Sequence, residues 1–313
     1  MIQKVNKNIL NPMIRPSYLQ KGDTVAIVSP AKKITPQEIQ FAIQFLESFG
    51  LKVILGENIY NSWNQFSGSD LERATDFQWA LNSNEVKAIF CSRGGYGSVR
   101  IVDQIDFAVF NANPKWIIGY SDITVFHNHI NSNYSTMTIH GPVPLNIINT
   151  IEELDSANKL IQMLFGKKQK TNFTYHPLNK LGETSGKLIG GNLSVLSGLI
   201  GTNSDFESSG SILFLEDLCE ENYKLDRMLF HLQKSQKLNN IKGILIGGFT
   251  DMTDLSNWFL EDSYELIAKR FYELPIPIAF GFPAGHTSTN TPLLLGAKYS
   301  LTVDKSNSKL ELL

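Results

Sequence analysis

The first half of this 313-residue chain alternates short apolar runs with amphipathic stretches, and this alternation limits its possible folds more than any other feature. Strands of a parallel sheet covered on both faces are continuous apolar runs in sequence. Five runs have this character, at 24–29, 51–55, 86–91, 116–118 and 136–139. Turn residues and stretches with helical spacing separate them. The pattern predicts an α/β fold with a mostly parallel N-terminal sheet and helices on both of its faces.

Two of the intervening helices have clear start signals. Thr35 and Glu38 have the spacing of a capping box, Pro36 occupies the first helical position, and Gly50 ends that helix. Ser69 or Asp70 begins the next one. The apolar side chains that we expect these two helices to bury are Ile39, Ala42, Ile43 and Leu46 in the first and Leu71, Ala74 and Leu81 in the second.

The length of the chain favours two domains, because single cores seldom grow beyond about 250–300 residues. We expect an N-terminal α/β domain over 1–150 and a smaller, mixed α/β C-terminal domain over 187–313. Between them the periodic pattern weakens, and 151–186 is predicted to be a polar linker. The elements expected in the C-terminal domain are strands at 211–215 and 241–246, helices around 225–232 and 261–273, and a terminal hairpin over 297–313.

Charge and composition exclude several classes of protein. The net charge is −2, without a large Lys/Arg cluster, so no nucleic-acid partner is expected. A run of about 18 apolar residues is absent, and the first 20 residues hold no signal-peptide core, so we expect no membrane partner and a cytoplasmic protein. Cys91 and Cys219 are far apart in sequence and have no nearby histidine. They fit neither a zinc site nor a disulfide framework.

Ligands of parallel sheets bind at the carboxyl ends of the strands, and two glycine-containing turns fall there. Ser121 follows the run 116–118 and begins a helix, which resembles a nucleophile elbow without the G-x-S-x-G pattern. The simpler interpretation is a helix N-cap. The turn Gly94-Gly95-Tyr96-Gly97 lacks the spacing of a dinucleotide or P-loop motif. Its backbone amides fit a structural turn, a nucleotide site or an oxyanion hole.

Histidines and carboxylates supply the remaining candidates. His286 lies in a loop of small residues that presents a side chain instead of packing it. His140, at a strand end, is a second candidate for lining a cleft. Glu216 ends an apolar strand, so it must be paired or lie at a cleft, and Asp217 points the other way. The histidines expected to be structural or exposed are His127, His129, His176 and His231.

Taken together, these segments resemble the LD-carboxypeptidases, the muramoyltetrapeptide carboxypeptidase family of serine peptidases. Each motif is short, but the ordered set is specific and runs from about residue 15 to the C-terminus. The matching segments are Lys21-Gly22-Asp23, Arg93-Gly94-Gly95-Tyr96-Gly97, Gly119-Tyr120-Ser121-Asp122, His140-Gly141-Pro142, Gly190-Gly191-Asn192, Leu215-Glu216-Asp217 and Gly285-His286.

The resemblance implies a catalytic triad assembled across the two domains. By motif match, Ser121 is the nucleophile, His286 the general base and Glu216 the residue that orients the imidazole. The implied reaction releases the terminal D-Ala from a murein tetrapeptide by cleaving an L,D amide bond. It belongs to peptidoglycan recycling and requires no metal and no cofactor. A homodimer is also implied.

Other residues enter through the same resemblance. Backbone N–H groups of Gly94, Gly95 and Asp122 are expected to hold the oxyanion. The terminal carboxylate of the substrate needs a cation or N–H donors, and Arg93 and Lys187 are the candidates.

Three alternative functions remain open. The family is similar to microcin self-immunity peptidases, which cleave peptidyl-nucleotide amides, but the loop insertion typical of them is not evident between Asn192 and Glu216. A non-catalytic binding protein for a small ligand would keep the three triad residues apart. A nucleotide-dependent enzyme would use the turn at 94–97.

Overall fold

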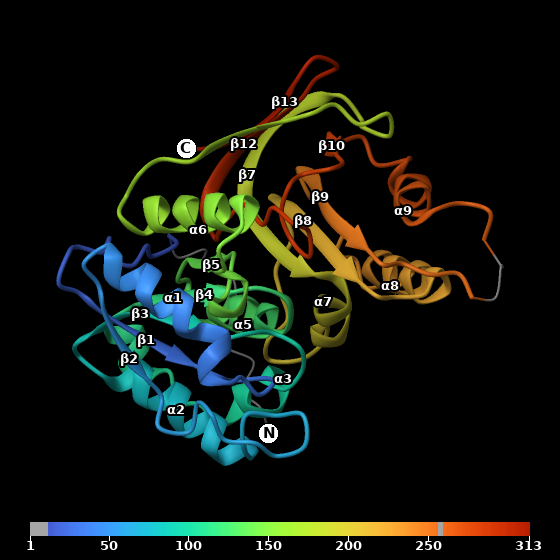
Figure 1. Cartoon of the computed structure of the whole chain (residues 1–313). Helices are drawn as coiled ribbons and strands as arrows, with labels where there is room; N and C mark the ends of the chain where they lie inside the picture. The colour runs from blue at the N-terminus through green and yellow to red at the C-terminus, as the bar shows by residue number, and fades with distance from the viewer. Residues whose placement is uncertain (1–11, 256–258) are drawn as a thin grey trace.

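The computed structural model describes residues 12–255 and 259–313. Residues 1–11, part of the segment in which no signal-peptide core is expected, lie outside the described residues, as do 256–258. The described chain forms one six-stranded sheet and one seven-stranded sheet. In Figure 1 the first sheet lies among the blue and teal elements, and the second extends to the upper right.

The first sheet contains the five predicted strands. Its order is β11-β5-β4-β3-β1-β2, and all neighbours except β11 and β5 are parallel. The sixth strand, β11, comes from far along the chain, pairs antiparallel with β5 and was not predicted. The bounds are β1 (Thr24–Val28), β2 (Lys52–Leu55), β3 (Val86–Cys91), β4 (Trp116–Gly119), β5 (Thr138–His140) and β11 (Leu293–Leu295).

Helices cover both faces of this sheet, as predicted. Alternate side chains of β1 point to opposite faces. Val25 and Ile27 belong to the same core cluster as Ile39 and Leu46 of α1. Ala26 and Val28 belong to the cluster that holds buried residues of α2 and α5. The helices are α1 (Pro36–Ser48), α2 (Asp70–Asn82), α3 (Ser98–Ile101), α4 (Ala108–Ala112) and α5 (Thr124–Tyr134).

The predicted helix starts are confirmed, and one predicted core residue is wrong. The capping boxes at Thr35 and Ser69 are both present. Leu71 is 71% exposed, because the buried face of α2 runs instead through Ala74, Phe77 and Leu81. Leu71 lies in the first turn, to one side of that face.

The second sheet has the order β10-β9-β8-β7-β12-β13-β6. Its strands β7 to β10 are parallel, and β12, β13 and β6 continue it in antiparallel pairing, which includes the predicted terminal hairpin. Leucines of α7, α8 and α9 pack on one face. The bounds are β6 (Lys170–Phe173), β7 (Gly182–Asn192), α7 (Leu193–Leu199), β8 (Ser211–Leu218), α8 (Asn222–Lys234), β9 (Gly243–Thr250), α9 (Ser263–Phe271), β10 (Ile278–Ala279), β12 (Lys298–Val303) and β13 (Ser308–Leu312).

The stretch 151–186, expected to be a polar linker, contains helix α6 (Ile151–Leu164), strand β6 and the start of β7. Thr150 caps α6, and its Oγ1 accepts a hydrogen bond from the Glu153 N–H. Leu160 and Leu164 of α6 lie in one core cluster with Val25 of the first sheet and Leu188 of the second. The two sheets therefore share part of their core. Domain boundaries at 150 and 187 remain a prediction.

Within the described ranges, no helix combines the length and the apolar character that a membrane span requires.

Candidate active site

Ser121 lies in a sharp turn between β4 and α5. Its φ is +64°, in the left-handed region that residues other than glycine seldom adopt. Ser121 is the first residue of a single 3₁₀ turn (Ser121–Ile123). Helix α5 follows this turn, and its N-cap position is Ile123. The structure therefore contradicts the simpler interpretation of Ser121 as the N-cap. Uncommon backbone angles at a strand-to-helix turn are typical of functional sites.

The glycine turn after β3 lies directly against Ser121. A Cβ added to Gly94 would lie 2.8 Å from the Cβ of Ser121 and 3.1 Å from its Oγ. The carboxylate of Asp122 accepts a hydrogen bond of 2.8 Å from the Ser98 N–H, at the start of α3, and burial raises the pKa of Asp122. These contacts join the two turns and bring Gly94 against the side chain of Ser121.

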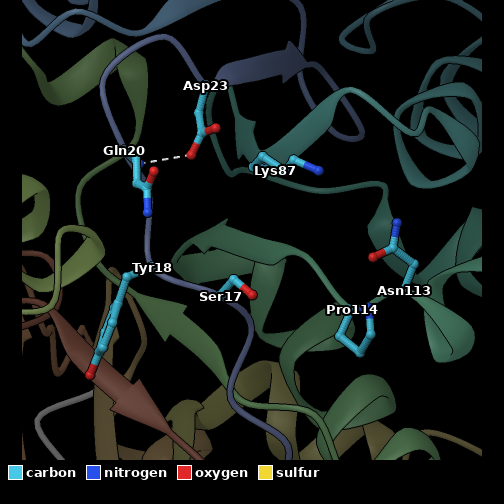
Figure 2. A pocket seen from close by; sticks show the side chains of 7 residues that line it. All are labelled: Ser17, Tyr18, Gln20, Asp23, Lys87, Asn113 and Pro114. Atoms are coloured by element: carbon cyan, nitrogen blue, oxygen red, sulfur yellow. Dashed lines mark hydrogen bonds between the residues drawn. The ribbon is translucent and has the colours of Figure 1, made fainter.

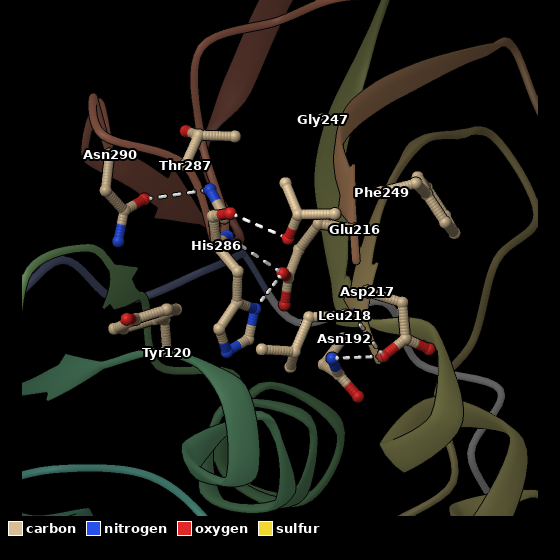
Figure 3. A network of polar contacts seen from close by, with 12 residues as sticks. Tyr120, Asn192, Glu216, Asp217, Leu218, Gly247, Phe249, His286, Thr287 and Asn290 are labelled. Carbon is tan, nitrogen blue, oxygen red and sulfur yellow. Dashed lines mark hydrogen bonds and ion pairs between the residues drawn. The ribbon is translucent and has the colours of Figure 1, made fainter. Parts of the chain in front are cut away.

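Glu216 and His286 are joined by a short polar contact. Glu216 is fully buried at an irregularity of β8, where its neighbours in sequence pair with residues of β9 that are three positions apart. Its Oε2 accepts hydrogen bonds from the Nδ1 of His286 at 2.6 Å and from the His286 N–H at 3.3 Å (Figure 3). A carboxylate only accepts, so Nδ1 carries the proton and Nε2 of a neutral ring is left as an acceptor.

Contacts around the His286 loop hold this pair in place. Gly285 has φ +100°, and a Cβ there would lie 2.7 Å from the Cβ of Glu216, so a larger residue would separate the pair. The Gly285 N–H donates to Oδ1 of Asn290 at 2.9 Å, and Oγ1 of Thr250 donates to the His286 carbonyl at 2.9 Å. Both sides of His286 are thus fixed by hydrogen bonds.

Tyr120 connects the Ser121 turn with the His286 loop. Its ring centroid lies 4.8 Å from that of His286, and its hydroxyl donates to Oδ1 of Asn146 at 3.0 Å. Burial raises the pKa of Tyr120 to about 12, so the hydroxyl stays neutral. The residue before Ser121 therefore packs on His286, and the three residues of the implied triad lie in one region of the molecule.

Two protein-family models match the chain, the LD-carboxypeptidase N-terminal domain over residues 25–141 and the LD-carboxypeptidase C-terminal domain over residues 185–301. The chain belongs to the LD-carboxypeptidase family. It is therefore a carboxypeptidase, a hydrolase of the serine peptidase type. The expected family and α/β fold are confirmed.

Relatives and solved structures agree with this assignment. The chain is 34% identical to the "Probable murein peptide carboxypeptidase" of Bacillus subtilis (strain 168), over 97% of both chains. It is 30% identical to the murein tetrapeptide carboxypeptidase of Pseudomonas aeruginosa, over 85% of this chain and 89% of that one.

Among solved structures, muramoyltetrapeptide carboxypeptidase from Oxalobacter formigenes superposes with a TM-score of 0.83 at 26% identity, covering 92% and 98% of the two chains. The microcin C7 self immunity protein MccF shares the fold, with a TM-score of 0.85 at 23% identity over 95% and 98%.

Of the two cations considered for the substrate carboxylate, one lies away from the site of this carboxypeptidase. Lys187 pairs with Ser211 at the start of β8, whereas Glu216 pairs with Asn192 at the other end, roughly 16 Å further along β7 at 3.3 Å per residue. Lys187 is therefore not a site residue. Arg93 stays beside the glycine turn, where its Nη1 donates to the Lys33 carbonyl at 3.2 Å.

Asp217 points away from His286, as predicted, and organises a second network. It accepts hydrogen bonds from Nδ2 of Asn192 at 2.8 Å and from the Ser194 N–H at 2.9 Å. Burial and the adjacent Glu216 raise the pKa of Asp217 to about 7. The Asn192 N–H donates to Oγ1 of Thr124 at 3.1 Å, which connects β7 to the helix after Ser121. Asn192 ends the glycine-rich segment at a strand terminus, but its residue type and position alone predict no role for it.

The histidines differ from prediction at one position. His140 is completely buried against Tyr120 and Phe214, so it does not line a cleft. A strand end next to glycine and proline resembles an exposed turn in sequence, but β11 covers it here. His127, also buried, contacts the Gly119 carbonyl through Nε2 at 2.8 Å, and burial lowers its pKa to about 4. The remaining three are structural or exposed, as predicted: His129, His176 and His231.

Two of the hollows lie near opposite ends of the strands of the first sheet. The larger, of about 270 Å³, is shown in Figure 2, and its lining includes Asp23, Lys87 and Pro114 at the amino ends of the strands. It contains no predicted site residue. The smaller lies beside His286 and is lined by Tyr120, Pro142, Asn146, Glu153, Ser156, Thr287, Ser288 and Asn290. The smaller hollow therefore adjoins the candidate active site.

Proposed function

We propose that this carboxypeptidase releases the terminal D-alanine of a murein tetrapeptide, with Ser121, His286 and Glu216 as its catalytic triad. The observation that carries the proposal is the 2.6 Å contact between buried Glu216 and Nδ1 of His286, beside the strained turn of Ser121. The substrate is supported by relatives that are named murein peptide and murein tetrapeptide carboxypeptidases.

The proposed reaction has two steps. Oγ of Ser121 attacks the carbonyl carbon of the last amide bond while Nε2 of His286 takes its proton, and the same proton passes to the departing amine of D-alanine. Water then hydrolyses the acyl-enzyme by the same route. Glu216 holds the ring in the required tautomer and stabilises the imidazolium.

The negative oxygen of each tetrahedral intermediate is assigned to backbone N–H groups of Gly94, Gly95 and Asp122. Support comes from the contact between Gly94 and Ser121 and from the hydrogen bond between Asp122 and Ser98. A donor of this kind contributes about 3–4 kcal/mol to transition-state stabilisation.

Arg93 is the candidate that remains for the carboxylate of the departing residue, because it adjoins the glycine turn and its buried Nε has no partner among the described groups. A role in peptidoglycan recycling, a cytoplasmic location and a homodimer complete the proposal. The recycling role and the homodimer rest on the resemblance to the family, and the cytoplasmic location rests on the absence of a long apolar run in the sequence.

The test is D-alanine release from a murein tetrapeptide, followed by mass spectrometry. A peptide ending in L-alanine and the Ser121→Ala variant run in parallel. We expect release only from the D-alanine peptide, with kcat lowered about 10⁶-fold in Ser121→Ala, since loss of a triad nucleophile has effects of this order.

Release by Ser121→Ala at the wild-type rate would exclude Ser121 as the nucleophile. A folded wild-type protein that releases nothing from any tetrapeptide would contradict the substrate. A peptidyl-nucleotide amide is the next substrate to assay, because MccF, which shares the fold, was solved with glutamyl sulfamoyl guanosine.

A further inference from the structure

The hydrogen bond to Glu216 fixes one nitrogen of the His286 ring but leaves the direction of the other less restrained. Both contacts go to the same oxygen, since Oε2 accepts from Nδ1 at 2.6 Å and from the His286 N–H at 3.3 Å. A hydrogen bond tolerates bending by about 30° at little cost. A swing of that size about Nδ1 moves Nε2 by roughly 1 Å, and a displacement of about 1 Å at a reacting atom lowers a rate about 100-fold. The direction of Nε2 therefore depends on a further contact.

Tyr120 supplies a contact to the body of the imidazole. Its ring centroid lies 4.8 Å from that of His286, with an angle of 53° between the two ring planes. Figure 3 shows the Tyr120 ring on the side of the imidazole away from Glu216. The side chain of His286 is only 14% exposed, so little space is left into which the ring could turn. Glu216 thus restrains one ring nitrogen, and Tyr120 restrains the rotation of the ring.

Two contacts hold the Tyr120 side chain itself. Its hydroxyl donates to Oδ1 of Asn146 at 3.0 Å, and its ring meets the buried ring of His140 edge-to-face at 5.8 Å. Asn146 lies in a short 3₁₀ turn, in which the Leu145 N–H donates to the Ser92 carbonyl at 3.0 Å. Ser92 directly follows β3 and precedes the glycine turn. The Tyr120 ring is therefore attached to the first sheet at two points.

Tyr120 is also joined to the nucleophile by one peptide bond. Its backbone is extended, with φ −151° and ψ −175°, and Ser121 follows it at the end of β4. We propose that Tyr120 is a positioning residue, which holds the His286 imidazole in the rotation that directs Nε2 to Oγ of Ser121. A shift of this segment would move Tyr120 and Ser121 together and keep their relation to the ring. The inference deepens the proposed function and rests on it, because it takes His286 to be the general base.

The first test is steady-state kinetics of D-alanine release. Tyr120→Leu removes the ring that contacts His286, whereas Tyr120→Phe keeps the ring and loses only the hydrogen bond to Asn146. We expect kcat to fall about 30-fold in Tyr120→Leu, and about fivefold in Tyr120→Phe, as for the loss of one hydrogen bond. KM should stay within about twofold of wild type in both variants, because a positioning residue acts on the reacting atoms and not on substrate binding.

The second test needs no substrate. Relaxation of the ¹³C nucleus at Cε1 of His286, in protein with labelled histidine, reports the motion of the ring, and a His286→Gln protein identifies its resonance. We expect the order parameter to fall from the range of rigid groups, about 0.85, to below about 0.6 in Tyr120→Leu. Tyr120→Phe should lie between these values. An effect on global stability alone would leave the order parameter of the folded protein unchanged.

Two further variants serve as controls. Tyr272→Leu makes the same exchange just after α9, at a side chain that is 73% exposed, and should change neither kcat nor the ring order. Asn146→Ala removes the acceptor of the Tyr120 hydroxyl and keeps both rings, so it should match Tyr120→Phe. If circular dichroism shows that Tyr120→Leu does not fold, these two milder variants decide, and wild-type ring order in both overturns the proposal.

The two proposals fail in distinguishable ways. An unchanged order parameter in folded Tyr120→Leu overturns the positioning role, even where the wild type releases D-alanine. A raised KM at unchanged kcat also overturns it, because Tyr120 would then bind substrate instead of holding the ring. If the wild type releases no D-alanine but Tyr120→Leu still loosens the His286 ring, the restraint by Tyr120 stands and the proposed reaction fails.

Discussion

The two segments that meet at the candidate site are built in different ways. The Ser121 turn is local, since strand β4, the turn and helix α5 follow one another directly, and Gly94 packs against it. The Glu216–His286 pair joins residues 70 positions apart and depends on a strand irregularity and on Gly285 at positive φ. One segment places an oxygen atom, and the other sets the tautomer of an imidazole.

This difference separates two kinds of sensitivity. The residues packed around Ser121 determine the position of its hydroxyl. Added side-chain volume at one of these contacts is therefore expected to lower activity most. The partners of His286 act through hydrogen bonds. Replacing an acceptor there by a group of equal size that also donates is therefore expected to lower activity most. Substitutions that change only volume or only hydrogen bonding therefore distinguish the two segments.

Among the substitutions that compare the two segments, the largest effect is expected at Glu216. Glu216→Gln keeps the size of the side chain but places an amide beside Nδ1. The amide N–H can donate to Nδ1, which favours the tautomer in which Nε2 carries the proton and cannot accept one from Ser121. We expect kcat for D-alanine release to fall about 10⁴-fold, as for the comparable carboxylate-to-amide substitution in a serine-peptidase triad. The measurement is steady-state kinetics at neutral pH, with circular dichroism to confirm the fold.

Asp217→Asn is the matched control, one residue away. Asp217 accepts hydrogen bonds from Nδ2 of Asn192 and from the Ser194 and Leu218 N–H groups. An asparagine at this position would turn its own N–H₂ group toward one of these donors. We expect the free energy of unfolding to fall by about 1–3 kcal/mol, with kcat changed less than at Glu216. A larger loss of kcat in Asp217→Asn than in Glu216→Gln would contradict the assignment of Glu216 as the partner of His286.

A smaller effect is expected from added volume beside Ser121. In Gly94→Ala the new Cβ would lie 2.8 Å from the Cβ of Ser121, so one of the two must move. We expect kcat to fall about 100-fold, the typical cost of a displacement of about 1 Å at a reacting atom. Gly198→Ala is the control, because nothing lies within 4 Å of the added atom. Equal activity of both variants would show that Gly94 does not determine the position of Ser121.

Most of the first sheet could be predicted from sequence, since its strands are continuous apolar runs followed by glycine or polar turns. Strand β11 could not, because it has three residues and its pairing with β5 is non-local. Helix α6 was missed because Ile151 at its start is 84% exposed and Ser156 interrupts its apolar face. Short non-local elements leave little local signal in a sequence.

The candidate site follows the same rule. Ser121 and Gly94 were found from strand–turn–helix patterns. The partnership of Glu216 with His286 came from family resemblance, because no sequence spacing predicts a contact across 70 residues. The contact of Tyr120 with His286 gave no signal, since it joins residues far apart in the sequence. The hydrogen bond of Tyr120 to Asn146 likewise exists only in the folded chain.

The smallest effect concerns two buried histidines, His127 beside the Gly119 carbonyl and His140 beside the Tyr120 ring. Burial lowers the pKa of His127 to about 4 and that of His140 well below its usual range. An unfolded chain has histidine pKa values near 6.5. Below that pH it binds protons that the native state does not bind. Stability is therefore lost as the pH falls from about 6.5, by about 2 kcal/mol at pH 5 for His127.

His140→Leu removes one of these residues. We expect the difference in unfolding free energy between pH 7 and pH 5, from urea denaturation, to be smaller than in wild type. His231→Gln, on an exposed helix surface, should leave that difference unchanged. An unchanged difference in His140→Leu would mean that native His140 accepts a proton above pH 5. A charge would then lie next to Tyr120, 5.8 Å from its ring, and the Ser121 turn would respond to pH through its own packing instead of through His286.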